Sequence, residues 1–72
     1  MKQVLVFKTS VGSSQDLRAV EPLLNKLLTE TERWNFDLED CDKILRIEAE
    51  FVQAYSVIEN LQGLGISCSE LS

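Results

Sequence analysis

Residues 32–49 read ERWNFDLEDCDKILRIEA, and the alternation within this stretch decides the fold. In 32–38 the apolar types Trp, Phe and Leu occupy every second position, and in 43–49 Leu, Ile and Ala do the same. Alternation with period two is typical of a strand with one buried face. The polar residues 39–42 separate the two runs. The stretch therefore predicts a β-hairpin.

The sequence on either side of the hairpin predicts a strand and a helix. Residues 2–9 are rich in β-branched and aromatic types, which favours a strand. Apolar residues then recur every three or four positions from Ser14 to Leu28, which predicts a helix that kinks at Pro22. The same spacing returns in 50–61 and predicts a second helix, and 65–71 are expected to form a last strand.

Details of the second helix follow from its apolar stripe. Phe51 is expected on the buried face with Val57 and Leu61, and Gly63 is expected at the helix C-terminus. Tyr55 is expected at the edge of the core, and Trp34 of the hairpin within it.

The predicted order β-α-β-β-α-β gives a single α+β domain over residues 1–72. Right-handed crossovers then favour a ferredoxin-like βαββαβ sandwich, with an antiparallel sheet of order 4-1-3-2 and both helices on one face. The other face is a candidate interaction surface. Its predicted members are Val4, Val6, Asn35, Asp37, Arg46 and Glu48.

Composition excludes several classes of function. The 72 residues carry a net charge of −5 and contain no histidine, so an imidazole base or metal ligand is absent. An acidic chain lacks the basic surface that binds nucleic acid. No apolar run approaches the roughly 20 residues of a membrane span, and no secretory signal is recognisable. We therefore expect a cytoplasmic protein.

The loop after the first strand is the candidate site. It contains Gly12, Ser13, Ser14, Gln15 and Asp16 at the start of the first helix. The S-x-x-D spacing predicts a capping box, in which Ser13 accepts from the Asp16 N–H and the Asp16 carboxylate accepts from the Ser13 N–H. Alternatively, free N–H groups at this helix start hold a small anion, although Asp16 repels one.

Several segments together resemble the heavy-metal-associated domain of small copper chaperones and copper-transporting ATPases. These segments are Phe7-Lys8-Thr9, Val20-x-Pro22-Leu23-Leu24-Asn25, Trp34-x-Phe36-Asp37-Leu38, Asp42-Lys43-Ile44-Leu45, Val57-Ile58 and Gly65-Ile66. The resemblance implies a C-x-x-C pair in the first loop, whose thiolates bind Cu(I) or another soft ion. Ser13 and Asp16 occupy those two positions here.

The two cysteines of the chain do not replace that pair. Cys41 is expected in the hairpin turn and Cys68 in the last strand as a small, half-buried apolar side chain. These elements lie at opposite edges of the predicted sheet, too far apart for a disulfide. The nearby acidic residues Glu39, Asp40 and Asp42 are interpreted as a solvated turn, since they lack the spacing of a Ca²⁺ loop.

The sequence therefore predicts a non-enzymatic, cofactor-free interaction or regulatory module that has lost its soft-metal site. Its partner would be another protein or a second copy, bound by the open sheet face or an edge strand. One alternative is an altered metal carrier that uses Ser13, Asp16 and a partner's ligands. Another is an acyl-phosphatase-like enzyme, for which Arg18 is the one available arginine near the loop.

Overall fold

The computed structural model describes residues 2–37, 39 and 43–71. Strands and helices follow each other in the predicted order, β-α-β-β-α-β. They are β1 (Gln3–Thr9), α1 (Ser14–Leu27), β2 (Arg33–Asp37), β3 (Ile44–Ala49), α2 (Ala54–Gly63) and β4 (Cys68–Glu70). The α+β class predicted from the alternation is therefore confirmed.

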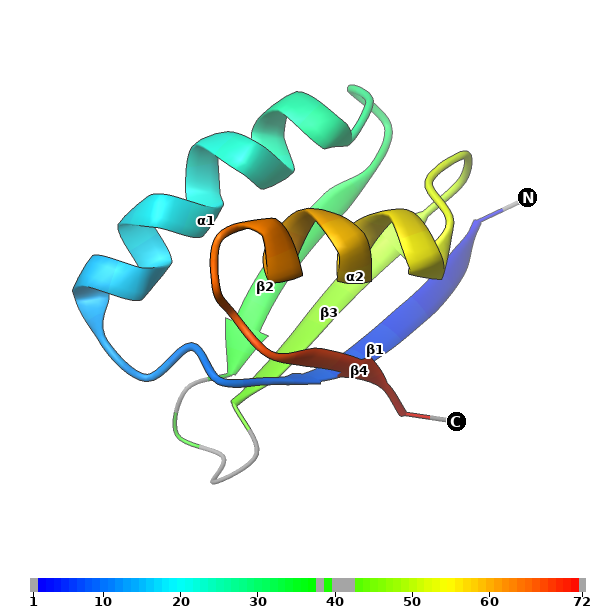
Figure 1. The fold of residues 1–72 in the computed structure, drawn as a ribbon. Coiled ribbons are helices and arrows are strands. Elements are labelled where there is room, and N and C mark those ends of the chain that lie inside the picture. The colour runs from blue at the N-terminus through cyan, green and yellow to red at the C-terminus, as the bar shows by residue number, and fades with distance from the viewer. Residues whose placement is uncertain (1, 38, 40–42, 72) are drawn as a thin grey trace.

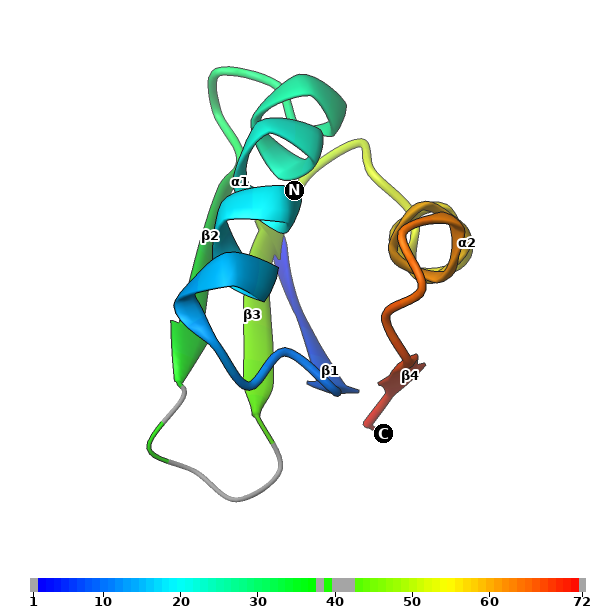
Figure 2. The same cartoon turned by 60° about the vertical axis from the view of Figure 1, so that its left-hand side comes forward.

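The four strands form one antiparallel sheet of order β2-β3-β1-β4. This is the predicted order read from the opposite edge. β1 lies between β3 and β4, with Leu5 opposite Ile47 and Thr9 opposite Cys68. Both helices lie on the same side of this sheet (Figures 1 and 2), which leaves its other face uncovered by helices.

The core lies between the sheet and the two helices. Alternate residues of β1 and β3 point into it, as the period-two pattern predicts. The apolar side chains on one face of α1 and of α2 pack against these strand residues. The buried members are Leu5, Phe7, Val20, Leu24, Leu28, Leu45, Ile47, Ala49, Val57 and Leu61.

The first helix begins at Ser14, as predicted, and continues past Pro22 to Leu27. Pro22 lacks the N–H that would donate one turn back, so its position costs the helix one hydrogen bond. Val20 and Leu24 on the buried face are fully inaccessible to solvent. Packing of this face therefore stabilises the helix in spite of the proline.

The second helix begins at Ala54, four residues later than expected. The backbone N–H groups of Glu50, Phe51 and Val52 donate to the Glu32 carboxylate, which holds this segment as a loop. The prediction for Phe51 was therefore wrong, because its side chain is 67% exposed. Tyr55 is also exposed, in contrast to the expected place at the core edge.

The last strand is shorter than predicted, since it begins at Cys68. Gly63 ends α2 as expected, but Gly65 is the residue with the left-handed conformation, at φ 80°. This conformation lets the Ile66 N–H donate to the Leu61 carbonyl, which closes the helix end. Residues 65–67, which the pattern assigned to the last strand, therefore lie in the connection between α2 and β4.

In the described part of the chain, neither helix is both long and apolar enough to cross a membrane.

Candidate functional site

The first loop is fixed at both ends by the body of the fold. At its start, the Thr9 hydroxyl donates to the Lys43 carbonyl at 2.7 Å. Ser10 and Ser67 are joined twice, by the Ser10 N–H to the Ser67 carbonyl and by the Ser67 N–H to the Ser10 Oγ. Val11 is fully buried in the core. The exposed residues that follow are therefore presented from a rigid base.

Ser13 caps the first helix, as the S-x-x-D spacing predicts. Its backbone is extended, and its Oγ accepts from the Asp16 N–H at 3.1 Å. The second half of the predicted capping box differs, because the Asp16 Oδ2 accepts from Gly12 N–H at 3.3 Å instead of from Ser13. The carboxylate thus reaches one residue further back and closes the loop on itself.

This arrangement places a carboxylate at the positive end of α1. An acidic side chain there neutralises the partial charge of the helix N-terminus, and it occupies donors that a bound anion would need. Gly12, Ser13, Ser14 and Gln15 are exposed, and Asp16 is half-buried. The loop therefore offers two serine hydroxyls and one carboxylate, which are hard oxygen ligands.

Cys68 does not add sulfur to this loop. It lies opposite Thr9 on β4, and its side chain belongs to the hydrophobic core. Burial raises the pKa of the Cys68 thiol from 9.0 to about 11, so the thiol stays protonated at neutral pH. The expectation of an apolar role for Cys68 fits this environment, although the side chain is fully rather than half-buried.

The acidic turn and Cys41, which were not predicted to bind metal, fall mostly outside the described residues. Asp40, Cys41 and Asp42 lie outside the described residues. The predicted turn and the predicted distance between Cys41 and Cys68 therefore also lie outside them. Glu39 is described and exposed. Across residues 2–37, 39 and 43–71, no group of three or more Cys, Asp or Glu side chains is arranged to hold a metal ion.

The open face of the sheet brings the predicted interaction residues together. Val4 lies opposite Glu48, and Val6 lies opposite Arg46, which in turn lies opposite Asn35. The Arg46 guanidinium is 3.8 Å from the Asp37 carboxylate. Val4 is 62% exposed. The face is therefore a mixed surface of two valines among charged and amide groups.

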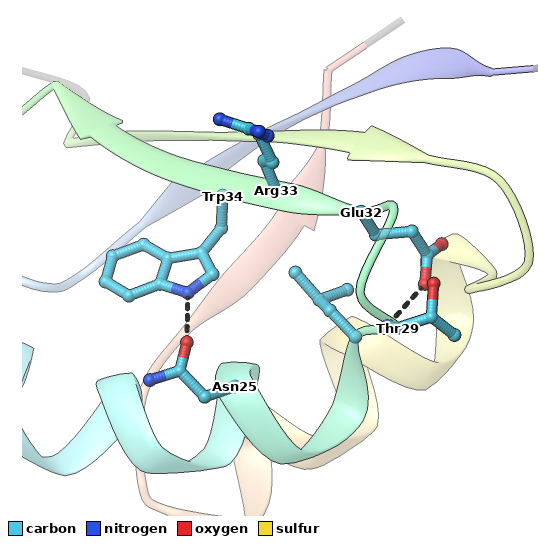
Figure 3. Close-up of a pocket in the computed structure, with 6 residues that line it drawn as sticks. Asn25, Thr29, Glu32, Arg33 and Trp34 are labelled. Carbon is cyan, nitrogen blue, oxygen red and sulfur yellow. Dashed lines mark hydrogen bonds between the residues drawn. The ribbon is translucent and has the colours of Figure 1, made fainter.

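Glu32 was not singled out from the sequence, yet its carboxylate accepts four backbone hydrogen bonds. Its Oε1 accepts from the Thr29 N–H at 2.9 Å, as Figure 3 shows. Its Oε2 accepts from three successive N–H groups of residues 50–52, at 2.8 to 2.9 Å. Only 6% of the residue is exposed.

The electrostatics of Glu32 follow from these contacts. Burial by itself raises the pKa of a carboxyl, but the four N–H donors stabilise the charged form more strongly. Together they lower the pKa of Glu32 from 4.5 to about 2. The carboxylate is thus a permanent anion that joins the α1–β2 connection to the β3–α2 connection.

One sequence signal points to Glu32. Glu32, Trp34 and Phe36 are spaced two residues apart, so the alternation of 32–38 places all three side chains on the inner face of the strand. A carboxylate on an inner face needs hydrogen-bond partners. The pattern thus indicates that Glu32 is bonded, although it does not say to what.

A hollow of about 340 Å³ lies beside Glu32, between α1 and β2 (Figure 3). Two of its polar side chains are already engaged, because the Trp34 Nε1–H donates to the Asn25 Oδ1 at 2.9 Å and Glu32 accepts four backbone hydrogen bonds. Arg33 points away from α1, to the other side of β2. The hollow therefore has little polar chemistry left for a small ligand.

Comparison of the chain with protein-family models, curated proteins and solved structures gave no match.

Proposed function

We propose that this chain is a cytoplasmic, non-enzymatic interaction module with a ferredoxin-like βαββαβ fold that resembles the heavy-metal-associated domain but lacks its soft-metal site. The observation that carries the proposal is the mutual bonding of Ser13, Asp16 and Gly12 in the first loop. Ser13 and Asp16 stand at the two positions where the resemblance implies cysteines.

The chemistry of these two residues supports the loss of metal transport. Cu(I) is a soft ion that prefers thiolate and thioether ligands, and neither Ser13 nor Asp16 supplies sulfur. Their side-chain oxygen atoms also accept hydrogen bonds from the backbone N–H groups of Asp16 and Gly12. We infer that the Ser13 cap and the Asp16 carboxylate do for the helix end what a pair of thiolates would do in the family, which is to neutralise its partial positive charge.

An interaction role is supported by the surface rather than by the loop. The open sheet face carries exposed Val4 and half-buried Val6. The two edge strands, β2 and β4, are short, with five and three residues. An enzymatic role has less support, because the chain has no histidine and, within the part of the chain that the structure describes, no catalytic group is found beside the exposed Arg18 of α1.

A metal titration tests the proposal. The reduced protein is titrated with Cu(I) in the presence of a competing chelator, and separately with Zn(II), while the amide resonances of residues 12–16 are followed by NMR. We expect those resonances to stay in place. Binding of Cu(I) to a thiol elsewhere would move other resonances and leave residues 12–16 unchanged. Saturable shifts centred on the loop would contradict the proposal and favour an altered metal carrier.

A further inference from the structure

The outer edge of β2 is the longer of the two sheet edges. Among the described residues, β2 pairs with β3 alone, so its other side presents backbone groups without a strand partner. β2 has five residues, whereas β4 at the opposite edge has three. An edge strand of this kind is a template for a further strand.

The side chains of β2 divide between the two faces of the sheet. Trp34 and Phe36 lie on the helix-covered side and are half-buried against the core. Arg33, Asn35 and Asp37 lie on the open side. Figure 3 shows this division directly, because the Trp34 ring points toward α1 and Arg33 points away from it.

In the sequence of β2, Arg-Trp-Asn-Phe-Asp, the first and last residues carry opposite charges and the second and fourth are aromatic. Two copies aligned antiparallel can therefore pair charge with charge and ring with ring. In an antiparallel pair, residues directly opposite each other share a face, so an odd shift of register is excluded. With Asn35 opposite Asn35, Arg33 faces Asp37 of the second copy at both ends. Trp34 then faces Phe36 of the second copy, so that all five positions are matched by charge or by type.

The neighbouring registers are poorer. A shift that places Trp34 opposite itself sets Arg33 against Asn35 and removes Asp37 from the arginine. The opposite shift places Phe36 against itself and sets Asp37 against Asn35. Opposite charges and aromatic pairs across strands are favourable, so the register centred on Asn35 is selected.

We propose that β2 binds β2 of a second copy in this register, forming a twofold-symmetric dimer whose two sheets join edge to edge. The inference rests on the proposed interaction function and names its surface and its partner. A twofold axis through Asn35 makes the contact isologous and closed, so association stops at the dimer.

The aromatic residues of the edge are placed to take part. Within one chain the Trp34 and Phe36 rings meet edge to face, with centroids 5.9 Å apart. Trp34 also lines the hollow of about 340 Å³ between α1 and β2. In the dimer, the rings of the second copy would extend this pair into a cluster of four.

The charges at the ends of β2 remain accessible. Asp37 contacts Arg46 at 3.8 Å, and the two side chains are 40% and 48% exposed, so the carboxylate is open to another cation. The net charge of −5 on each chain opposes association. The two Arg33–Asp37 contacts of the dimer offset this repulsion where the chains are closest.

Charge reversal tests the inference. Arg33→Glu sets two acids opposite each other in a homodimer, and Asp37→Arg sets two arginines opposite each other. We expect each variant to dimerise about tenfold or more weakly than the wild type. An equimolar mixture of the two variants restores both attractive pairs, and so does the double variant. Dimerisation of the wild type, the two single variants, their mixture and the double variant is measured by sedimentation velocity under reducing conditions. The concentration series extends to about 1 mM.

Matched controls make the same changes of charge away from β2. Arg18→Glu on α1 and Glu59→Arg on α2 alter exposed side chains and should leave the dimerisation constant near that of the wild type. The mixture contains no chain that is absent from the single-variant samples. Asp37→Arg also removes the Arg46–Asp37 contact within one chain, but this loss is the same before and after mixing. It therefore does not explain stronger dimerisation in the mixture.

A dimer that is weakened in both single variants and recovered in the mixture supports the β2 interface. A wild type that stays monomeric at about 1 mM contradicts it, as does a dimer indifferent to both reversals or a mixture that stays monomeric. None of these results bears on the metal titration. Failure of the dimer is therefore distinguishable from failure of the proposed loss of the metal site.

Discussion

The Oε2 atom of Glu32 accepts a hydrogen bond of 2.9 Å from the backbone N–H of Val52, twenty residues further along the chain. The same oxygen also accepts from the N–H groups of Glu50 and Phe51. The contact joins the segment that leads into β2 to the segment that leads into α2. One side chain thus fixes the entry to two elements of the fold.

Replacing this carboxylate should destabilise the fold. In Glu32→Gln, the amide group presents an N–H to backbone N–H donors, so some of the four bonds are lost and the charge is gone. We expect the free energy of unfolding to fall by about 2 to 4 kcal/mol, as measured by urea denaturation. Glu30→Gln, an exposed neighbour, should change it by less than about 0.5 kcal/mol. Equal effects of the two changes would contradict the role of Glu32.

The low pKa of Glu32 predicts a dependence of stability on pH. The pKa is about 2 in the folded chain and 4.5 without the contacts, so the folded state favours the charged carboxylate. Its contribution is therefore complete above pH 4.5 and is lost as the pH falls toward 2. The difference in unfolding free energy between wild type and Glu32→Gln should shrink over this range. A difference that stays constant down to pH 2 would show that the charge is unimportant.

The cap of the first helix makes a smaller contribution. Ser13→Ala removes the acceptor of the Asp16 N–H and should lower the free energy of unfolding by about 1 kcal/mol. Ser14→Ala, one residue later, removes an exposed hydroxyl that does not cap the helix and serves as the control. Chemical denaturation of both variants measures the difference. A loss in Ser14→Ala as large as in Ser13→Ala would argue against the cap.

The buried thiol of Cys68 should resist modification. In a Cys41→Ser variant, Cys68 is the one remaining cysteine, and its pKa of about 11 is two units above that of a free thiol. We expect alkylation by iodoacetamide at pH 7 to be about a hundredfold or more slower in the folded chain than in urea. Alkylation at similar rates in both conditions would mean that the thiol is accessible and ionised.

Much of the fold is predictable because two periods alternate along the chain. The period-two runs around Trp34 and Ile47 locate β2 and β3, and the helical spacing around Val20 locates α1. The S-x-x-D spacing at Ser13 correctly gives the start of that helix. These features depend on neighbours in the sequence, which is why the sequence alone reveals them.

The errors arise where a distant residue decides the local structure. Residues 50–52 continue the helical spacing, but their N–H groups donate to Glu32 from another loop. For this reason α2 begins later and Phe51 is exposed. The Asp16 carboxylate accepts from the Gly12 N–H rather than from the Ser13 N–H, one residue further back than the S-x-x-D spacing predicts. Neither contact is encoded in a periodic pattern.

The central claim, that the first loop has lost a thiolate site, is tested most directly by restoring one. Cu(I) affinity is measured by competition with a chelator for the wild type and for Ser13→Cys/Asp16→Cys, with Ser14→Cys/Gln15→Cys as a control that has two thiols at the wrong spacing. The account predicts that Ser13→Cys/Asp16→Cys takes one Cu(I) from the chelator, while the wild type and the control leave it there. Binding by the wild type as tight as by Ser13→Cys/Asp16→Cys, or no gain in that variant, would contradict it.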